Sequence, residues 1–201
     1  MDRIITFDQS VFRWINGHSS RWLDWTLWSL SQGWSWFVII LTAFLFVAYR
    51  SERKNWLWLL IGLALCFLLA DQISTNAIKD GVQRLRPCYE LEDVRMFRTG
   101  KGGHYGFVSS HAANAFAVAM FLSLMYKNRR KETEEENRSA NQTFSILMFT
   151  WAAIVCYSRC YLGKHYPGDV VCGALLGLGV GALVYFVICK IRSWISSRSE
   201  A

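Results

Sequence analysis

The sequence predicts an all-α membrane protein, a polytopic helical bundle with five transmembrane helices and amphipathic helices at its N-terminal end. Hydrophobic residues make up 53% and aromatic residues 15% of the 201-residue chain, which is more than an ordinary soluble domain carries. Five stretches with almost no charge are long enough to cross a bilayer, which takes about 20 residues of helix. Trp and Tyr gather at the ends of these stretches, as is typical of membrane–water interfaces.

Residues 1–30 are predicted to form an interfacial segment, and residues 31–195 the membrane-embedded domain. Between Ile4 and Leu30, Phe, Trp and Ile residues mix with charged ones, which indicates one or two amphipathic helices lying on the membrane. A crossing by Trp22–Leu30 would make a sixth span, although this run is short.

The five predicted spans lie at residues 26–49, 55–78, 111–126, 139–158 and 170–189. Asp71 interrupts the second span, on the same helical face as Thr75 and Lys79. Because a charge inside a bilayer is costly, Asp71 is expected to face the interior of the bundle.

In the last predicted span, Gly173, Gly177 and Gly181 repeat every four residues. Small residues at this spacing let two helices approach closely in lipid. We expect this glycine stripe to pack within the monomer rather than between two copies.

Five crossings would place three polar segments on one side of the membrane, and these segments hold the residues best suited to chemistry. The first runs from Lys79 to Pro87 and reads K-x6-R-P. The second is Ser109-Ser110-His111, and the third, from Ser158 to Asp169, reads S-R-x5-H-x3-D. In this order the three motifs resemble the signature of the type 2 phosphatidic acid phosphatase superfamily, membrane enzymes that hydrolyse lipid phosphates.

Lys79, Arg86 and Arg159 supply three cations from these segments, which suits an anionic phosphate. Phosphoryl transfer depends mainly on positioning and charge stabilisation, and the planar fork of Arg binds two phosphate oxygens at once. His165 can attack phosphorus through one ring nitrogen and form a phosphohistidine if an acceptor holds the other nitrogen. Asp169, four residues later, can be that acceptor, and it can also cap the last span.

His111 stands at the start of the third predicted span, where it can protonate the leaving oxygen. Ser109 or Ser110 can cap this helix, whose first N–H groups favour an anion. Ser110 replaces a glycine of the family motif and is also expected to contact the phosphate. The resemblance implies the same roles: His165 as nucleophile, Asp169 as its partner, His111 as acid, and Lys79, Arg86, Ser109 and Arg159 around the phosphate.

Three further cations, Arg84, Arg95 and Arg98, are interpreted as contacts to solvent or to lipid head groups. Cys88 and Cys160 flank two of the motifs, so the sequence allows a disulfide between them. The sequence shows no cluster of carboxylates, or of Cys and His, with the spacing of metal ligands. A metal-independent reaction without cofactors is therefore expected.

The resemblance implies an integral membrane phosphatase acting on a lipid phosphate or diphosphate, with undecaprenyl diphosphate as the first expectation. A lipid A phosphatase or a phosphatidylglycerophosphate phosphatase is the alternative within the family. A phospholipid-binding transporter or scaffold without turnover would explain the spans and the charge. It would not explain a His–Asp pair, a second His and three cations on one side.

The formal charge of +7 suits anionic lipids or phosphate, and the scatter of basic residues between apolar spans argues against nucleic-acid binding. Without the three expected phosphate ligands, the motif side holds 8 Lys and Arg residues against 11 on the other side. The positive-inside rule then places the motif side outward. The expected location is a bacterial inner membrane, with the site open to the periplasm or the outside.

Overall fold

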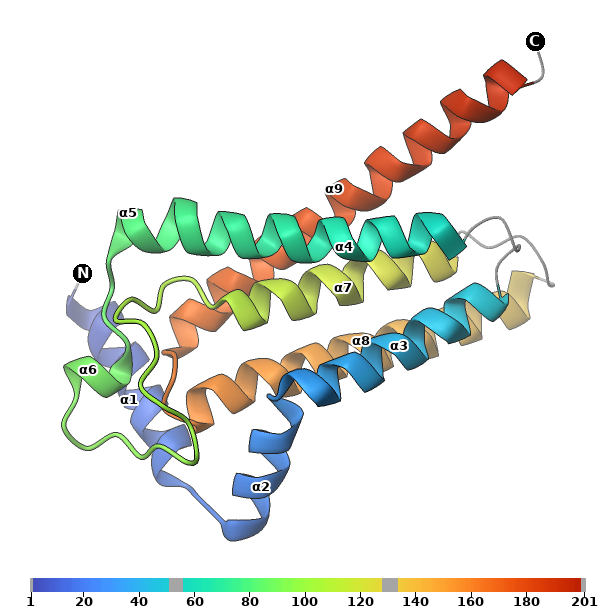
Figure 1. Ribbon diagram of the computed structural model, residues 1–201. Coiled ribbons are helices and arrows are strands. Elements are labelled where there is room, and N and C mark those ends of the chain that lie inside the picture. The colour runs from blue at the N-terminus through green and yellow to red at the C-terminus, as the bar shows by residue number, and fades with distance from the viewer. Residues whose placement is uncertain (1, 51–55, 128–133, 200–201) are drawn as a thin grey trace.

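The computed structural model describes residues 2–50, 56–127 and 134–199, and Figure 1 shows their arrangement. All regular elements in these ranges are helices, so the all-α prediction is confirmed there. They are α1 (Asp2–Gly17), α2 (Arg21–Leu30), α3 (Gly33–Arg50), α4 (Trp56–Gln72), the π-helix η2 (Ile73–Lys79), α5 (Asp80–Val82), α6 (Pro87–Glu90), α7 (Ser110–Lys127), α8 (Glu134–Tyr161) and α9 (Pro167–Ser199).

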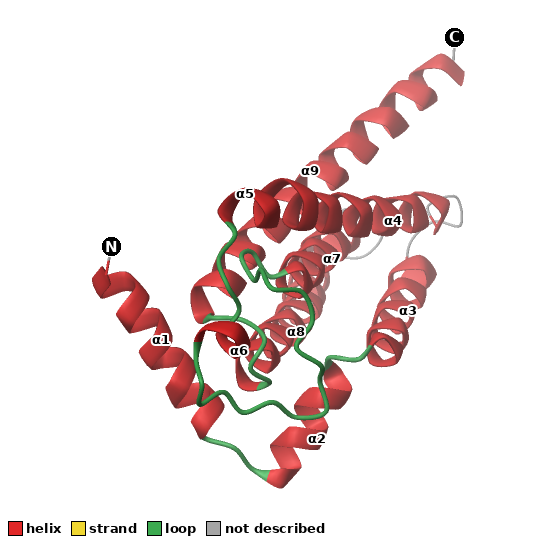
Figure 2. Ribbon diagram, turned by 60° about the vertical axis from the view of Figure 1, so that its left-hand side comes forward, coloured by secondary structure: helices red, strands yellow, loops and turns green. Residues whose placement is uncertain are grey.

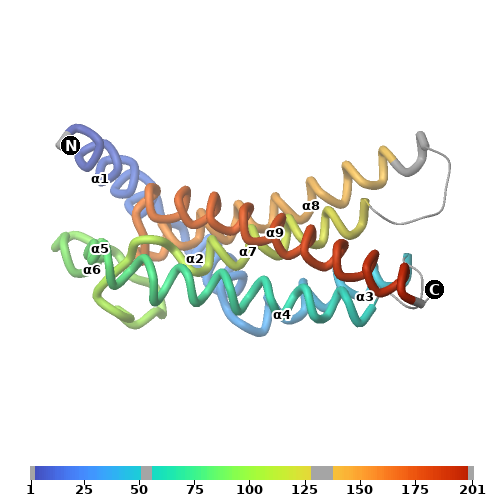
Figure 3. Tube along the Cα trace, turned by 90° about the horizontal axis from the view of Figure 1, so that it is seen from above, coloured from blue at the N-terminus to red at the C-terminus, as the bar shows by residue number. Residues whose placement is uncertain are grey.

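Helix α7 lies at the centre of the bundle and packs against α4, α8 and α9 (Figures 1 and 3). Five of its eleven buried residues are alanine, and Ala113 and Ala117 have no exposed surface. The glycine stripe of α9 faces this surface, since a Cβ atom at Gly177 would lie 2.2 Å from the carbonyl oxygen of Ala113. The stripe therefore packs within the monomer, as predicted, and brings the start of α9 against the start of α7.

Four helical stretches of the described chain are long and apolar enough to cross a membrane, at Gly33–Arg50, Trp56–Val82, Arg138–Tyr161 and Pro167–Arg198. The predicted span at residues 111–126 coincides with α7, which is not among them. Because its neighbours shield α7 from lipid, this helix can carry His, Ser and Asn residues that a lipid-facing helix would not. The predicted count of five spans is therefore not confirmed.

Helix α2 also bears on the count of spans. Its 10 residues amount to about 15 Å of helix, about half the thickness of the hydrocarbon core of a bilayer. The structure therefore gives no support to a sixth crossing by Trp22–Leu30.

Helices α1 and α2 lie beside one end of the bundle, where the loops between residues 83 and 109 also gather (Figure 2). Helix α1 packs against α8 and α9. Its inner face is buried through Asp8 and Phe12, whereas Ile4 and Phe7 on the outer face are 76% and 70% exposed. A helix with two such faces fits the predicted interfacial segment, whose position on the membrane stays a prediction.

Candidate active site

The three sequence motifs meet at the loop end of the bundle, around a cavity of about 310 Å³. One wall comes from the end of α4, from η2 and from the loop after it, and a second from the start of α7. The third comes from the end of α8 and the loop that follows. Of the predicted site residues, only Ser109 and Asp169 do not line this cavity. The lining residues are Asp71, Thr75, Lys79, Arg86, Ser110, His111, Asn114, Arg159 and His165.

The hydroxyl of Ser110 is the centre of a polar cluster on the first two walls. It accepts hydrogen bonds from Nζ of Lys79 at 2.6 Å and from Oγ of Ser74 at 2.9 Å, and it lies 3.3 Å from Oγ1 of Thr75. These three partners come from η2, and π-helical turns are frequent at functional sites. Ser110 therefore fixes the ammonium group of Lys79 at the cavity, from the position where the family motif has glycine.

Two guanidinium groups line the cavity together with Lys79. Arg159, in the last turn of α8, is only 7% exposed, and its Nε has no hydrogen-bond partner among the described residues. Arg86 donates through Nε to the carbonyl oxygen of Tyr105 at 3.1 Å. Burial lowers the pKa of Arg86, but its ordinary value is so high that the group keeps its charge. Three cations and one carboxylate, Asp71, leave the cavity net positive, which suits an anion.

His165 lies in the loop between α8 and α9 and is 2% exposed. Its Nδ1 is 3.5 Å from Oδ2 of Asp169 and has no hydrogen-bond partner in the described part of the chain. Such contacts are often long before a substrate binds and tighten in the complex. Burial, together with the charges of Arg159, Arg86 and Lys79, lowers the pKa of His165 well below its usual value near 6.5. The imidazole is therefore neutral at neutral pH and keeps a free electron pair.

Asp169 lies in the first turn of α9 with no exposed surface. Its Oδ2 accepts a hydrogen bond from the backbone N–H of Tyr166 at 3.0 Å, and its Oδ1 accepts one from Nη1 of Arg84 at 2.9 Å. Both carboxylate oxygens are thus held by donors other than His165. This arrangement fixes the carboxylate beside the ring, where it can orient the imidazole.

Ser109 does not reach the cavity, although the resemblance placed it at the phosphate. It is fully buried, and its backbone N–H donates to the carbonyl oxygen of Asp169 at 3.0 Å. Its hydroxyl accepts from the backbone N–H of Ala112 at 3.5 Å, at the start of α7. Ser109 therefore joins α7 to α9, and its neighbour Ser110 lines the cavity instead.

Arg84 was interpreted as a contact to solvent or lipid, and this interpretation is wrong. Its guanidinium bridges two carboxylates, with Nη1 on Asp169 at 2.9 Å and Nη2 on Asp8 of α1 at 2.7 Å. Asp8 also accepts from the backbone N–H of Gly168 at 2.8 Å. Arg84 thus ties the N-terminal helix to the start of α9, directly after the loop that carries His165. The sequence offered no signal for this contact, because Asp8 and Arg84 are far apart along the chain.

The interpretation of Arg95 as a solvated loop residue is also wrong. Its guanidinium makes a two-pronged ion pair with Asp24 of α2, at 2.8 and 2.5 Å. Arg98 lies over the rings of Trp25 and Trp28, with 4.9 and 5.1 Å to their centroids. Both cations therefore hold α2 against the loop that ends at the cavity.

The allowed disulfide between Cys88 and Cys160 is not formed, and both residues are buried free thiols. Among the described residues, no group of three or more His, Cys, Asp and Glu side chains could hold a metal ion.

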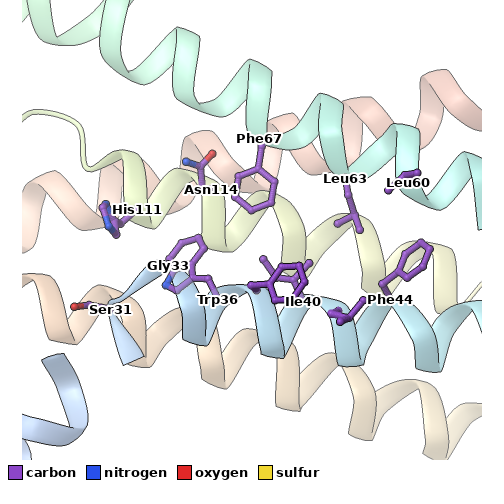
Figure 4. Close-up of a pocket in the computed structure, with 12 residues that line it drawn as sticks. Ser31, Gly33, Trp36, Ile40, Phe44, Leu60, Leu63, Phe67, His111 and Asn114 are labelled. Atoms are coloured by element: carbon purple, nitrogen blue, oxygen red, sulfur yellow. The ribbon is translucent and has the colours of Figure 1, made fainter. Parts of the chain in front are cut away.

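A second, larger hollow of about 540 Å³ adjoins the cavity, between α3, α4 and α7. Figure 4 shows it as a groove walled mostly by aromatic and aliphatic side chains. His111 and Asn114 line both the cavity and the groove. The ring of Trp36 meets that of His111 edge-on at 5.7 Å. The site thus joins the cationic cavity to the apolar groove, which matches a molecule with a charged head group and hydrocarbon chains.

Known proteins share this sequence pattern over most of the chain. A family model described as the PAP2 superfamily matches residues 56–192. The chain is 28% identical to the lipid A 4'-phosphatase of Porphyromonas gingivalis over its whole length and 81% of that protein. It is 30% identical to the lipid A 4'-phosphatase of Bacteroides thetaiotaomicron over 94% of the chain and 80% of the relative.

Two solved structures share the fold. The crystal structure of Aquifex aeolicus LpxE matches with a TM-score of 0.60 and 24% identity, over 88% of this chain and 93% of that one. A PAP2-type phosphatidylglycerolphosphate phosphatase from Bacillus subtilis matches with a TM-score of 0.69 and 18% identity, over 97% and 89%. With the motifs at one cavity, the apolar helices and the matched family model, the chain belongs to the PAP2 superfamily and is an integral membrane lipid phosphatase.

Proposed function

We propose that this enzyme hydrolyses a phosphate monoester of a lipid A-type glycolipid through a phosphohistidine at His165. The observation that carries the proposal is the junction of the cationic cavity with the apolar groove at His111 and Asn114. The phosphate would lie among Lys79, Arg86 and Arg159, and the acyl chains would lie in the groove.

The chemistry follows from the positions of three side chains. Nδ1 of His165 faces Asp169, so Nε2 is the nitrogen that attacks phosphorus. The bond from phosphorus to the lipid oxygen breaks, and that oxygen takes a proton from His111. Water then attacks the phosphohistidine and gives a proton to His111. Inorganic phosphate leaves and His165 is neutral again. The three cations stabilise the charge on the non-bridging oxygens in both steps.

The proposed substrate class is supported by the names of two similar proteins and by the carboxylate of Asp71. The two curated relatives are named lipid A 4'-phosphatases, which supports lipid A over undecaprenyl diphosphate, the first expectation from sequence. Asp71 adds a negative charge to the cavity. A second phosphoryl group beside the first would be repelled by it, so a monoester fits better than a diphosphate.

The assay is phosphate release by the purified enzyme in detergent with a chelator present. The panel is lipid A, undecaprenyl diphosphate, phosphatidylglycerophosphate and phosphatidic acid. We expect the highest kcat/KM on lipid A, and no turnover but retained lipid binding by His165→Ala. A preference for the diphosphate would contradict the substrate class, and a requirement for added Mg²⁺ or Zn²⁺ would contradict the mechanism. Binding without turnover of any lipid would favour a transporter or scaffold.

The site is proposed to face the periplasm or outside of a bacterial inner membrane. A cysteine at Gly103, where a side chain meets open space, should react with an impermeant thiol reagent in intact cells. A cysteine at Ser139, near the opposite end of α8, should not react. Native thiols are assessed in the unsubstituted protein, and the reverse labelling pattern would overturn the orientation.

A further inference from the structure

The cavity and the groove share two lining residues, His111 and Asn114. On α7 these residues are three positions apart, so they lie on one face, about 4.5 Å apart along the helix axis. A lipid with its phosphate in the cavity and its chains in the groove has to pass this junction. The part that passes is the group that links the phosphate to the chains.

Asn114 is the polar residue of this junction that the proposed chemistry does not use. Its Oδ1 is buried and has no hydrogen-bond partner among the described residues. Figure 4 shows the amide next to the ring of Phe67, at the end of the groove that His111 also lines. An amide oxygen left without a partner is costly, and buried polar groups in proteins almost always have one. No donor of the described residues reaches this oxygen, so a molecule bound across the junction is a source of the missing partner.

We propose that Asn114 is a specificity-determining residue that accepts a hydrogen bond from an O–H or N–H group of the linker between phosphate and chains. This inference rests on the proposed function, since it takes the cavity as the phosphate site and the groove as the chain site. An offset of about 4.5 Å corresponds to about three bonds from the ester oxygen. Hydroxyl or amide groups stand at such positions in sugars and amino sugars, whereas a polyprenyl chain has none.

Asn141 shows that an unpartnered amide oxygen alone is not a site. Its Oδ1 is also buried without a hydrogen-bond partner in the described part of the chain. It lines neither the cavity nor the groove. It lies on α8 about 27 Å along the helix from Arg159. What distinguishes Asn114 is its place at the junction, and Asn141 is a matched control for it.

The test compares two lipids that differ by one hydroxyl group, with the full-length enzyme in detergent. One is a 1-acyl-glycerol 3-phosphate, whose C2 hydroxyl stands about three bonds from the ester oxygen. The other is the same compound without that hydroxyl. The wild-type enzyme should favour the first by about tenfold in kcat/KM, which is the effect of about one hydrogen bond.

Asn114→Leu, which keeps the branched shape of the side chain and removes the amide, should bring this ratio close to one. The ratio should fall because kcat/KM decreases for the hydroxylated substrate and stays unchanged for the other one. Asn114→Ala is the second variant if the leucine variant does not fold, with the same expected ratio. Asn141→Leu should keep the wild-type ratio of about tenfold.

A wild-type ratio near one would overturn the proposal without any variant. A ratio that survives the loss of the Asn114 amide would overturn it too, as would equal losses on both substrates. Hydrolysis of lipid A but of neither test lipid would also count against the proposal. One hydrogen-bond donor and one acyl chain would then not be enough for a lipid to be recognised as a substrate. Release of phosphate from none of these lipids by the wild type would instead refute the proposed function.

Discussion

Replacing Arg159 by lysine keeps a positive charge at the cavity but removes the planar fork. Arg159 is buried in the last turn of α8 and lines the cavity with His165, and its Nε has no partner among the described residues. A guanidinium in this position can hold two non-bridging oxygens of a phosphate. Lysine offers a single point charge on a flexible chain, so the phosphate would no longer be fixed in line with the attacking nitrogen.

The expected loss is about a hundredfold in kcat/KM. Removing one fixed donor from the developing charge of a transition state costs about 2.7–4 kcal/mol, and each 1.36 kcal/mol is about a factor of ten in rate. Because lysine keeps the charge, the lower end of this range applies, at about 2.7 kcal/mol. Arg159 is 7% exposed, so water screens its charge only weakly. The loss in kcat/KM should therefore not be reduced by solvent screening.

The assay is the initial rate of phosphate release from lipid A in detergent, with Arg13→Lys as the control. Arg13 pairs with Asp93 at 3.5 Å on the surface, where both side chains are more than half exposed. Such a pair contributes little, so the control should stay within about twofold of the wild type. Arg95 is unsuitable as a control because it is paired with Asp24. A near-normal rate for Arg159→Lys, or equal losses in the two variants, would refute the assignment of Arg159 to the phosphate.

Three further predictions concern neighbouring charges. Arg84→Gln leaves the fully buried carboxylate of Asp169 without its cation, which should cost about 3–5 kcal/mol and lower the Tm in detergent. Arg84→Lys should restore part of the loss, and an unchanged Tm in the Gln variant would show that the pair is unimportant. Asp71→Asn removes the carboxylate of the cavity, so kcat/KM on undecaprenyl diphosphate should rise severalfold relative to lipid A; a constant ratio would contradict the role given to Asp71. NMR of labelled histidine, assigned with His165→Gln, should show the ring of His165 neutral at pH 6.5 without ligand. Inorganic phosphate should raise its pKa, because the anion offsets the cations that lower it, and should therefore bind more tightly as pH falls. Titration of His165 at or above pH 6.5 in the free enzyme would contradict this account.

Most of the candidate site could be predicted because its residue types are tied to short local patterns. Lys79, Arg86, His111, Arg159 and His165 all reach one cavity, although up to 86 positions of sequence separate them. Each pattern stands at the end of an apolar stretch. Because the helices that carry them lie side by side, these ends meet at one end of the bundle, as the predicted topology requires.

Contacts between distant elements could not be predicted in the same way. The pairing of Asp8 with Arg84 depends on where α1 lies against the bundle, which no local pattern encodes. Adjacent serines at a helix start point in different directions, so the packing of α7 on α9 decides which of Ser109 and Ser110 lines the cavity. Hydropathy averaged along α7 likewise carries no information on the helices that surround it.

The glycine stripe of α9 ties the spacing of His111 and Asp169, the proposed acid and the proposed partner of the nucleophile, to the packing of two backbones. His111 stands at the start of α7 and Asp169 at the start of α9, and the stripe brings the backbone of α9 directly against backbone carbonyl groups of α7. Two helices separated by side chains can change their distance when rotamers change, whereas helices whose backbones are in contact cannot. The two helices should therefore tilt as one body when bilayer thickness changes, so that His111 and Asp169 keep their separation. Gly177→Ala should push α9 away from α7, because its methyl group would overlap the carbonyl oxygen of Ala113. His111 and Asp169 would then move apart, although Gly177 lies about two helical turns from Asp169.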